Sequence, residues 1–382
     1  MSPRSVSADV NPDLLTWARE TAGLNLSSVA RRLHNIDKWE LGTEKPTVRQ
    51  LEALADLYKR PLAAFFLPTR PEEPSLPTDF RMLPSAEDRV LSKKVRLAMR
   101  TARRTQRLYA ELLNKLGTTE RSTLPNITAE EDPEELGTRV RSWLGVTVAD
   151  QLTWPDMPYA FRAWREAIEA RGTLILQLTM PVKESRGFSL ADGPIPTAVV
   201  SSSDAIAARI FTLFHELGHL LLNEGGICLP DPSTVSSNAS VEPFCNRFAG
   251  AVLVPSSSLS ERVRPSDLLG TAEAIADRLG EPARAFKVSR YVILFRLYAL
   301  GLVKSSQLQA VLRQLESREV ARPRRGGIRP AIKTLGQLGP RFVSAVLAAH
   351  RRGVITYSDV SHYLSLNLKY LPDLLRFIAA RG

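Results

Sequence analysis

The chain has 382 residues, a net charge of +11 and two cysteines, Cys228 and Cys245. Two cysteines exclude a disulfide framework, and neither a signal peptide nor a run of about eighteen apolar residues is seen, so we expect a cytoplasmic protein without a membrane span. The length suggests two or three domains, and the positive charge favours anionic partners such as nucleic acid or acidic protein surfaces. A uniformly basic surface also occurs in proteins that bind no DNA, so the charge alone does not decide between them.

The first part of the chain is predicted to form short helices. Asn11 or Asp13 can cap the first helix, and Ser27 or Ser28 can cap the second, which contains "LSSVARRL". The third helix, "TVRQLEALADLYKR", is stopped by Pro61. The prolines of "LPTRPEEPSLPTDF" then exclude a helix and indicate a linker.

A helical pattern returns over residues 89–116, and its first half is very basic. Spacings of three and four residues place several of the cations on one helix face. That face is a candidate for contact with nucleic acid, and a solvated surface is the simpler alternative. The candidate contacts in this helix are Lys93, Arg96, Arg100, Arg103, Arg104 and Arg107.

The middle of the chain combines two predicted strands with helices. The runs "GTLILQLTM" (172–180) and "PTAVVSS" (196–202) are predicted strands, and "KESRGFSLADG" between them is predicted to be a turn region. A helix over 211–222, the loop "NEGGICLPDPSTVSSNAS" and the helix "VEPFCNRFAGAVLVP", which ends at Pro255, follow. Mostly helical residues up to Leu315, the basic hinge "ESREVARPRRGGIRP" and three small C-terminal helices complete the chain. We therefore expect an α+β fold that is mostly helical.

The helix over 211–222 reads "FTLFHELGHLLL". Residues four apart lie on one face of a helix, so the imidazoles of His215 and His219 can converge on one zinc ion at about 2.0–2.1 Å. Zinc lowers the pKa of a water molecule in its open position, and Glu216 beside the pair could accept that proton. The alternative is a pair of hydrogen-bonded core histidines, but composition alone produces such a pattern only about a few times in a thousand sequences.

A zinc site with one open position needs a third protein ligand. No third histidine follows at a suitable spacing, so a carboxylate is expected. Glu242 on the following helix is the favoured candidate, and Asn246 one turn later could accept a hydrogen bond from the second ring nitrogen of a ligand histidine. Glu224 is the competing ligand, closer in sequence but in the loop. Cys245 is expected to be a small buried helix residue.

The segment "RIFTLFHELGHLLL" followed by "VEPFCNRFAGAVLVP" resembles the ImmA/IrrE family of metallopeptidases. The resemblance implies zinc ligands at His215, His219 and Glu242 and a general base at Glu216. It also implies a site-specific peptidase that cleaves a DNA-binding repressor, in stress responses or in the control of mobile elements. Ser201 departs from the pattern, since relatives often have asparagine after that strand, but it touches no ligand.

The segments "WARETAGLNLSSVARRL" and "KWELGTEKPTVRQLEALADLYKRPLAAFFLP" resemble the Xre-type helix-turn-helix that often precedes this peptidase, and "LPTDFR" and "FKVSRYVILFRLYALGLV" extend the resemblance over most of the chain. Only eight residues separate Ala30 from Trp39, and they must end one helix, form the turn and supply the recognition helix. A recognition helix reads bases from the major groove, and these eight residues leave only a short one. We therefore hypothesise that much of the base reading is lost. Arg31, Arg32 and Lys38 either touch phosphates or form a solvated face.

These patterns predict five segments. They are an Xre-like helix-turn-helix with a shortened recognition region over 1–70, a linker and basic helix over 71–125, an HExxH metallopeptidase domain over 126–265, a helical extension over 266–318 and a C-terminal helical domain over 319–382.

The predicted function is a zinc-dependent endopeptidase with a zincin-like core, of the gluzincin type with HExxH plus glutamate, that cleaves a helix-turn-helix repressor. The expected cofactor is a single Zn²⁺ per chain, with Mn²⁺ as the alternative, and DNA is a further candidate partner. We expect no membrane partner, and a dimer is one option for assembly. The alternative function is a DNA-binding regulator or antitoxin-like protein with a structural or vestigial metal site. Glu216 argues against that alternative, because a structural zinc needs no base.

Overall fold

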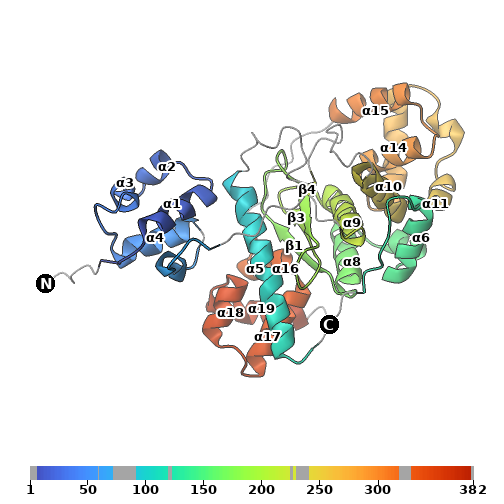
Figure 1. Cartoon of the computed structure of the whole chain (residues 1–382). Helices are drawn as coiled ribbons and strands as arrows, with labels where there is room; N and C mark the ends of the chain where they lie inside the picture. Colours follow the sequence, from blue (N-terminus) through green and yellow to red (C-terminus); the bar gives the residue numbers. More distant parts are fainter. Residues whose placement is uncertain are drawn as a thin grey trace. The chain divides into compact units, whose positions relative to one another are not determined.

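The computed structural model describes residues 7–58, 60–71, 92–118, 123–223, 227–228, 241–317 and 328–379 (Figure 1). The chain divides into two compact units, the first from residues 1–76 and 87–101 and the second from residues 77–86 and 102–382. The described residues are mostly helical with one small sheet, so the α+β prediction is confirmed. None of the described helices combines the length and the apolar composition that a membrane span requires.

The first unit is helical. Its elements are α1 (Pro12–Thr21), α2 (Leu26–Ala30), α3 (Ile36–Glu40), α4 (Val48–Tyr58), the 3-10 helix η1 (Leu62–Phe66) and the first turns of α5 (Lys93–Lys115). Asn11 caps α1, as one of the two predicted alternatives, by accepting a hydrogen bond from the backbone of Asp13. The predicted serine cap of α2 is wrong, because the helix starts earlier and the Asn25 side chain accepts from the Ser28 backbone at 2.9 Å.

One apolar core holds the first unit together. Its largest members come from α1, α3, α4 and η1, and they are Leu14, Leu15, Trp17, Ile36, Trp39, Leu51, Leu54, Tyr58 and Phe65. Helix α3 has five residues, which matches the short helix that the few residues before Trp39 allow.

The second unit contains a mixed sheet in the order β1-β3-β2-β4. Strands β1 (Leu174–Leu178) and β3 (Thr197–Ser201) run parallel, whereas β2 (Gly187–Leu190) is antiparallel to both β3 and β4 (Ile227–Cys228). The segment that contains β2 was predicted to be a turn region, and that prediction is wrong. Only Phe188 of its four residues favours a strand, and the segment is extended because it is buried and paired between two other strands.

Helix α9 (Ile206–Leu221) follows β3, packs on the sheet and contacts α10 (Val241–Leu253) (Figure 1). The two helices approach closely because Gly218 has no side chain. A Cβ atom there would stand 3.1 Å from Cys245 Sγ and 3.1 Å from a ring carbon of Phe248. Helices α6 (Pro133–Leu144) and α8 (Met157–Glu169) pack against α10 and α9 respectively, and the short α7 (Val148–Thr153) joins them.

Small helices complete the second unit. They are α11 (Ser256–Ser260), η3 (Pro265–Leu268), α12 (Ala272–Arg278), α13 (Gly280–Ala285), α14 (Arg290–Ala299), α15 (Ser305–Ser317), α16 (Pro330–Leu338), α17 (Pro340–Arg351), α18 (Tyr357–Leu364), η4 (Leu368–Tyr370) and α19 (Leu371–Ala379).

The C-terminal part therefore holds four α-helices among the described residues, not the three predicted. Gly339, with φ of 84°, and Pro340 separate α16 from α17, because a left-handed residue and a helix-starting proline break a continuous helix. Helix α16 packs beside β1, and the carbonyl of Gly336 accepts hydrogen bonds from Gln177 and Arg165, each at 2.8 Å.

Candidate metal centre

Helix α9 carries the two histidines on the face that it turns toward α10. His215 and His219 are fully buried, with 1% and 0% of their surface exposed. Their ring centroids lie 5.0 Å apart and their Nε2 atoms 3.2 Å apart. The i, i+4 spacing therefore brings one nitrogen of each ring to the same point, as helical geometry requires.

Glu242 in the first turn of α10 places its carboxylate against both histidines. One of its carboxylate oxygens lies 3.2 Å from His215 Nε2 and the other lies 3.1 Å from His219 Nε2. A tetrahedral zinc ion with bonds of about 2.0–2.1 Å holds its ligands about 3.3–3.4 Å apart. The distance between the two Nε2 atoms, and the distance from each of them to one Glu242 oxygen, are close to this value, so the two imidazoles and the carboxylate lie near enough to share one ion. The Glu242 side chain is 31% exposed, so solvent can reach the group.

These three residues form a group that could hold a metal ion, with all ligand atoms within 4.8 Å of one another. Donor types also fit, since two imidazoles and a carboxylate are ordinary zinc ligands. Burial raises the pKa of Glu242, but the adjacent imidazoles of His215 and His219 outweigh it and hold that pKa well below its usual range. The competing ligand Glu224 lies outside the described residues.

Asn246, one turn after Glu242, lies against the other nitrogen of His215. Its Oδ1 is 3.0 Å from His215 Nδ1. A carbonyl oxygen can only accept, so Nδ1 carries the proton and donates, and the Nε2 lone pair points to the other ligand atoms. Nδ1 of His219 has no hydrogen-bond partner of ordinary geometry among the described residues, and buried Cys245 is its neighbour.

Glu216 lies beside the ligands on the next position of α9, with none of its surface exposed. Burial raises its pKa to about 7, although His215 and His219 lower it. No hydrogen bond of ordinary geometry reaches either carboxylate oxygen among the described residues, and the Ser189 hydroxyl acts on it only weakly. A buried, nearly unpartnered carboxylate next to a metal-binding group is suited to accept a proton.

Strand β2 forms the wall behind Glu216, which the sequence did not indicate. A Cβ atom on Gly187 would stand 3.0 Å from Glu216 Oε1, 2.5 Å from Thr212 Cγ2 and 2.7 Å from the Val199 carbonyl oxygen. Gly187 and Ser189 were missed because their segment was predicted to be a turn. An isolated glycine within a short buried run was the one signal that could have indicated a close backbone approach.

The predicted nucleic-acid contacts of the first unit lie far in the sequence from His215, His219 and Glu242. Arg31 and Arg32 follow α2 and are exposed. Lys38 in α3 is exposed and forms an ion pair with Glu44 at 2.6 Å.

Most of the predicted contact residues of α5 form hydrogen bonds or ion pairs within the unit to which each belongs. Arg96 and Arg100 donate to the carbonyls of Glu20 and Thr21, at 3.4 and 2.6 Å. These carbonyls end α1, where a cation interacts favourably with the helix dipole.

Further along α5, Arg103 pairs with Asp192 at 2.8 Å, Arg104 contacts the His362 ring at 2.9 Å and Arg107 donates to the Arg103 carbonyl. These contacts give the cations structural roles, and nucleic-acid binding through them stays a prediction.

No curated protein and no solved structure matches the chain significantly. A family model does match, and its range contains all three residues of the metal-binding group together with Glu216 and Asn246. The match does not extend to the first unit. Residues 168–298 match Peptidase_M78, the IrrE N-terminal-like domain, and this part of the chain is thereby supported as a metallopeptidase of the IrrE/ImmA type.

Proposed function

We propose that the chain is a zinc-dependent endopeptidase in which His215, His219 and Glu242 hold the metal and Glu216 is the general base. One observation carries the proposal. The Nε2 atoms of His215 and His219 lie 3.2 Å apart, and each lies 3.1–3.2 Å from one oxygen of the Glu242 carboxylate. The fully buried carboxylate of Glu216 lies next to the two histidines on α9. The donor set also favours zinc over magnesium or calcium, which prefer oxygen ligands.

The metal, when bound, would polarise the scissile carbonyl and lower the pKa of a water molecule. Glu216 accepts the proton of the attacking water, so that a C–O bond forms at the carbonyl carbon. It then passes that proton to the nitrogen as the C–N bond breaks, and the products are a carboxylate and an amine. Asn246 holds the His215 ring in the tautomer whose Nε2 lone pair is available.

A peptidase acts on a protein substrate, and we propose that this substrate is a helix-turn-helix repressor in a stress-response or mobile-element system. The support is the sequence resemblance together with the helical first unit, whose α2 and short α3 follow each other as in a helix-turn-helix. We propose that this unit contacts the repressor or DNA. A gel shift with the DNA upstream of the protein's own gene tests whether base reading is lost. Tight, sequence-specific binding that persists at high salt would contradict that loss.

The second candidate is a DNA-binding regulator or antitoxin-like protein with a structural metal site. The exposed Arg31 and Arg32 favour some anionic contact by the first unit. A structural zinc, however, has four protein ligands and needs no base, whereas the described residues offer three ligands and Glu216.

Glu216→Gln separates the two candidates. We would co-express the protein with the helix-turn-helix repressor encoded nearest to it and follow the repressor by mass spectrometry. The variant is expected to bind zinc stoichiometrically and to cleave nothing, whereas Glu166→Gln, a control at an exposed glutamate of α8, should cleave normally. Full biological activity of the Glu216→Gln variant would refute the proposal that the protein acts as an enzyme. Absence of zinc from protein purified without chelator would refute the metal site.

A further inference from the structure

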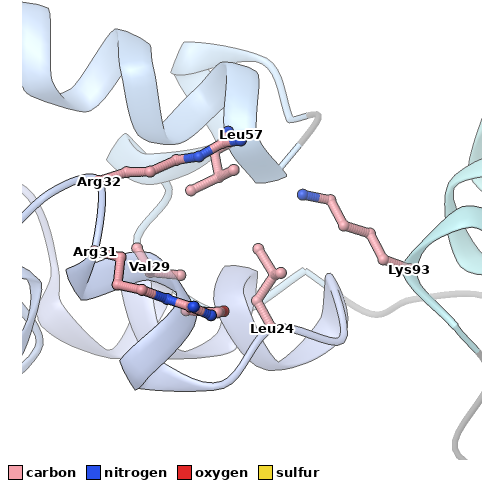
Figure 2. A pocket seen from close by; sticks show the side chains of 7 residues that line it. Leu24, Val29, Arg31, Arg32, Leu57 and Lys93 are labelled. Carbon is pink, nitrogen blue, oxygen red and sulfur yellow. The ribbon is translucent and has the colours of Figure 1, made fainter.

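The first unit contains a pocket of about 410 Å³, and Arg31 and Arg32, the candidate phosphate contacts, are among its lining residues. Small-molecule sites in proteins have volumes of about 300–1,000 Å³, so a small ligand would fit. The lining residues come from the segment around α2, from the end of α4 and from the first residue of α5, and all of them belong to the first unit (Figure 2).

Cations surround the pocket. Arg31, Arg32 and Lys93 line it, and no acidic side chain is among its described lining residues. Arg31 and Arg32 form no ion pair within the described part of the chain. Figure 2 shows Arg32 on the side of Leu57, Arg31 on the side of Leu24, and the Lys93 amine directed toward the space between them. Like charges around one hollow repel each other, and an anion between them would relieve that repulsion.

The remaining lining residues are apolar except for Ser28, whose hydroxyl donates to the Asn25 carbonyl at 2.8 Å. Val29 is fully buried there, and Leu24 and Leu57 are partly exposed. A bare inorganic anion would leave the exposed parts of Leu24 and Leu57 in contact with water, whereas a ligand with an apolar body would cover them. Arginine guanidinium groups bind phosphates in a bidentate manner and also stack on aromatic rings. The lining is therefore complementary to a ligand that carries both a phosphate and an aromatic ring.

We propose that this pocket binds a small aromatic phosphate of mononucleotide size. The phosphate lies among Arg31, Arg32 and Lys93, and the ring lies against Leu24 and Leu57. A duplex backbone would contact the arginines but would present no ring to these leucines, so the small ligand is favoured over DNA.

The test is isothermal titration of the full chain with AMP at low salt, with adenosine and inorganic phosphate as the two half-ligands. AMP should bind at one site per chain, and each half-ligand should bind at least tenfold more weakly. The double variant Arg31→Gln/Arg32→Gln should weaken AMP binding at least tenfold. Arg49→Gln, a control at an exposed arginine of α4 outside the pocket, should leave it unchanged. Thermal unfolding of each variant checks that the fold is kept.

The proposal is overturned if AMP shows no saturable binding, or if the double variant binds AMP as tightly as the parent does. A short DNA duplex provides a further arm. If the duplex binds, loses affinity in the double variant, and AMP does not bind, the arginines serve a DNA backbone and the pocket proposal is wrong. Phenyl phosphate that binds within threefold of AMP would support recognition of the aromatic phosphate without a requirement for the base.

Discussion

The substitution Gly187→Ala tests how closely strand β2 approaches the proposed base. The new methyl group would stand 2.5 Å from Thr212 Cγ2, 2.7 Å from the Val199 carbonyl oxygen and 3.0 Å from Glu216 Oε1. The carbonyl belongs to β3, the strand that pairs with β2, so it cannot move away by a side-chain rotation. Overpacking of this kind costs about 1–3 kcal/mol. The melting temperature of the second unit should fall by about 2–4 °C for each kcal/mol.

The Gly187→Ala variant should lose more catalytic activity than its lower stability explains. The methyl group pushes on the Glu216 carboxylate, and a displacement of about 1 Å from the productive position can reduce kcat about 100-fold. None of the three atoms nearest to the methyl group belongs to His215, His219 or Glu242, so zinc content should be unchanged. The assay therefore combines thermal unfolding, zinc content and the rate of repressor cleavage.

Two further variants serve as a control and as a rescue for this test. Gly336→Ala in α16 adds a methyl group with nothing within 4 Å, so stability and cleavage should stay at or slightly above the parent's values. Thr212→Ser removes the nearest atom, so Gly187→Ala/Thr212→Ser should recover part of the loss. If Gly187→Ala alone is as stable and as active as the parent, the close approach of β2 to Glu216 is not as described.

Two other predictions concern groups that hold the second unit and its site. Asn246→Ala removes the acceptor 3.0 Å from His215 Nδ1, so zinc affinity measured by chelator competition should fall about 10–100-fold, and unchanged affinity would show that Asn246 does not orient His215. Arg165 and Glu169 form a buried ion pair at 2.7 Å, so Arg165→Met should lower the free energy of unfolding by about 3–5 kcal/mol in chemical denaturation, because Glu169 keeps its burial without its partner. Arg162→Met on the exposed side of α8 is the control, and equal losses in both variants would contradict a special role for the buried pair.

The histidine pair could be predicted because it depends only on local geometry. Residues four apart on a helix face the same way whatever surrounds them, so His215 and His219 were expected to converge and their Nε2 atoms lie 3.2 Å apart. Glu242 was the favoured third ligand because a helix start with an asparagine one turn later offers both an oxygen ligand and a partner for an imidazole. The structure places both groups at the expected distances, and their roles remain proposals.

The surroundings of the site could not be predicted in the same way. Strand β2 is extended through its pairing with β3 and β4 rather than through its own four residues. The cations of α5 looked like a surface for nucleic acid, but several of them bind the α1 carbonyls, Asp192 or His362, which lie far away in the sequence.

The sequence by itself determined the helical spacing of the site and the chemical types of its ligands, because these follow from the repeat of one helix. The tertiary structure alone decided that Gly187 closes the wall behind Glu216 and that Arg31, Arg32 and Lys93 line one pocket together with apolar side chains. Such neighbours come from separate segments, and only the packing of their helices and strands determines which side chains meet.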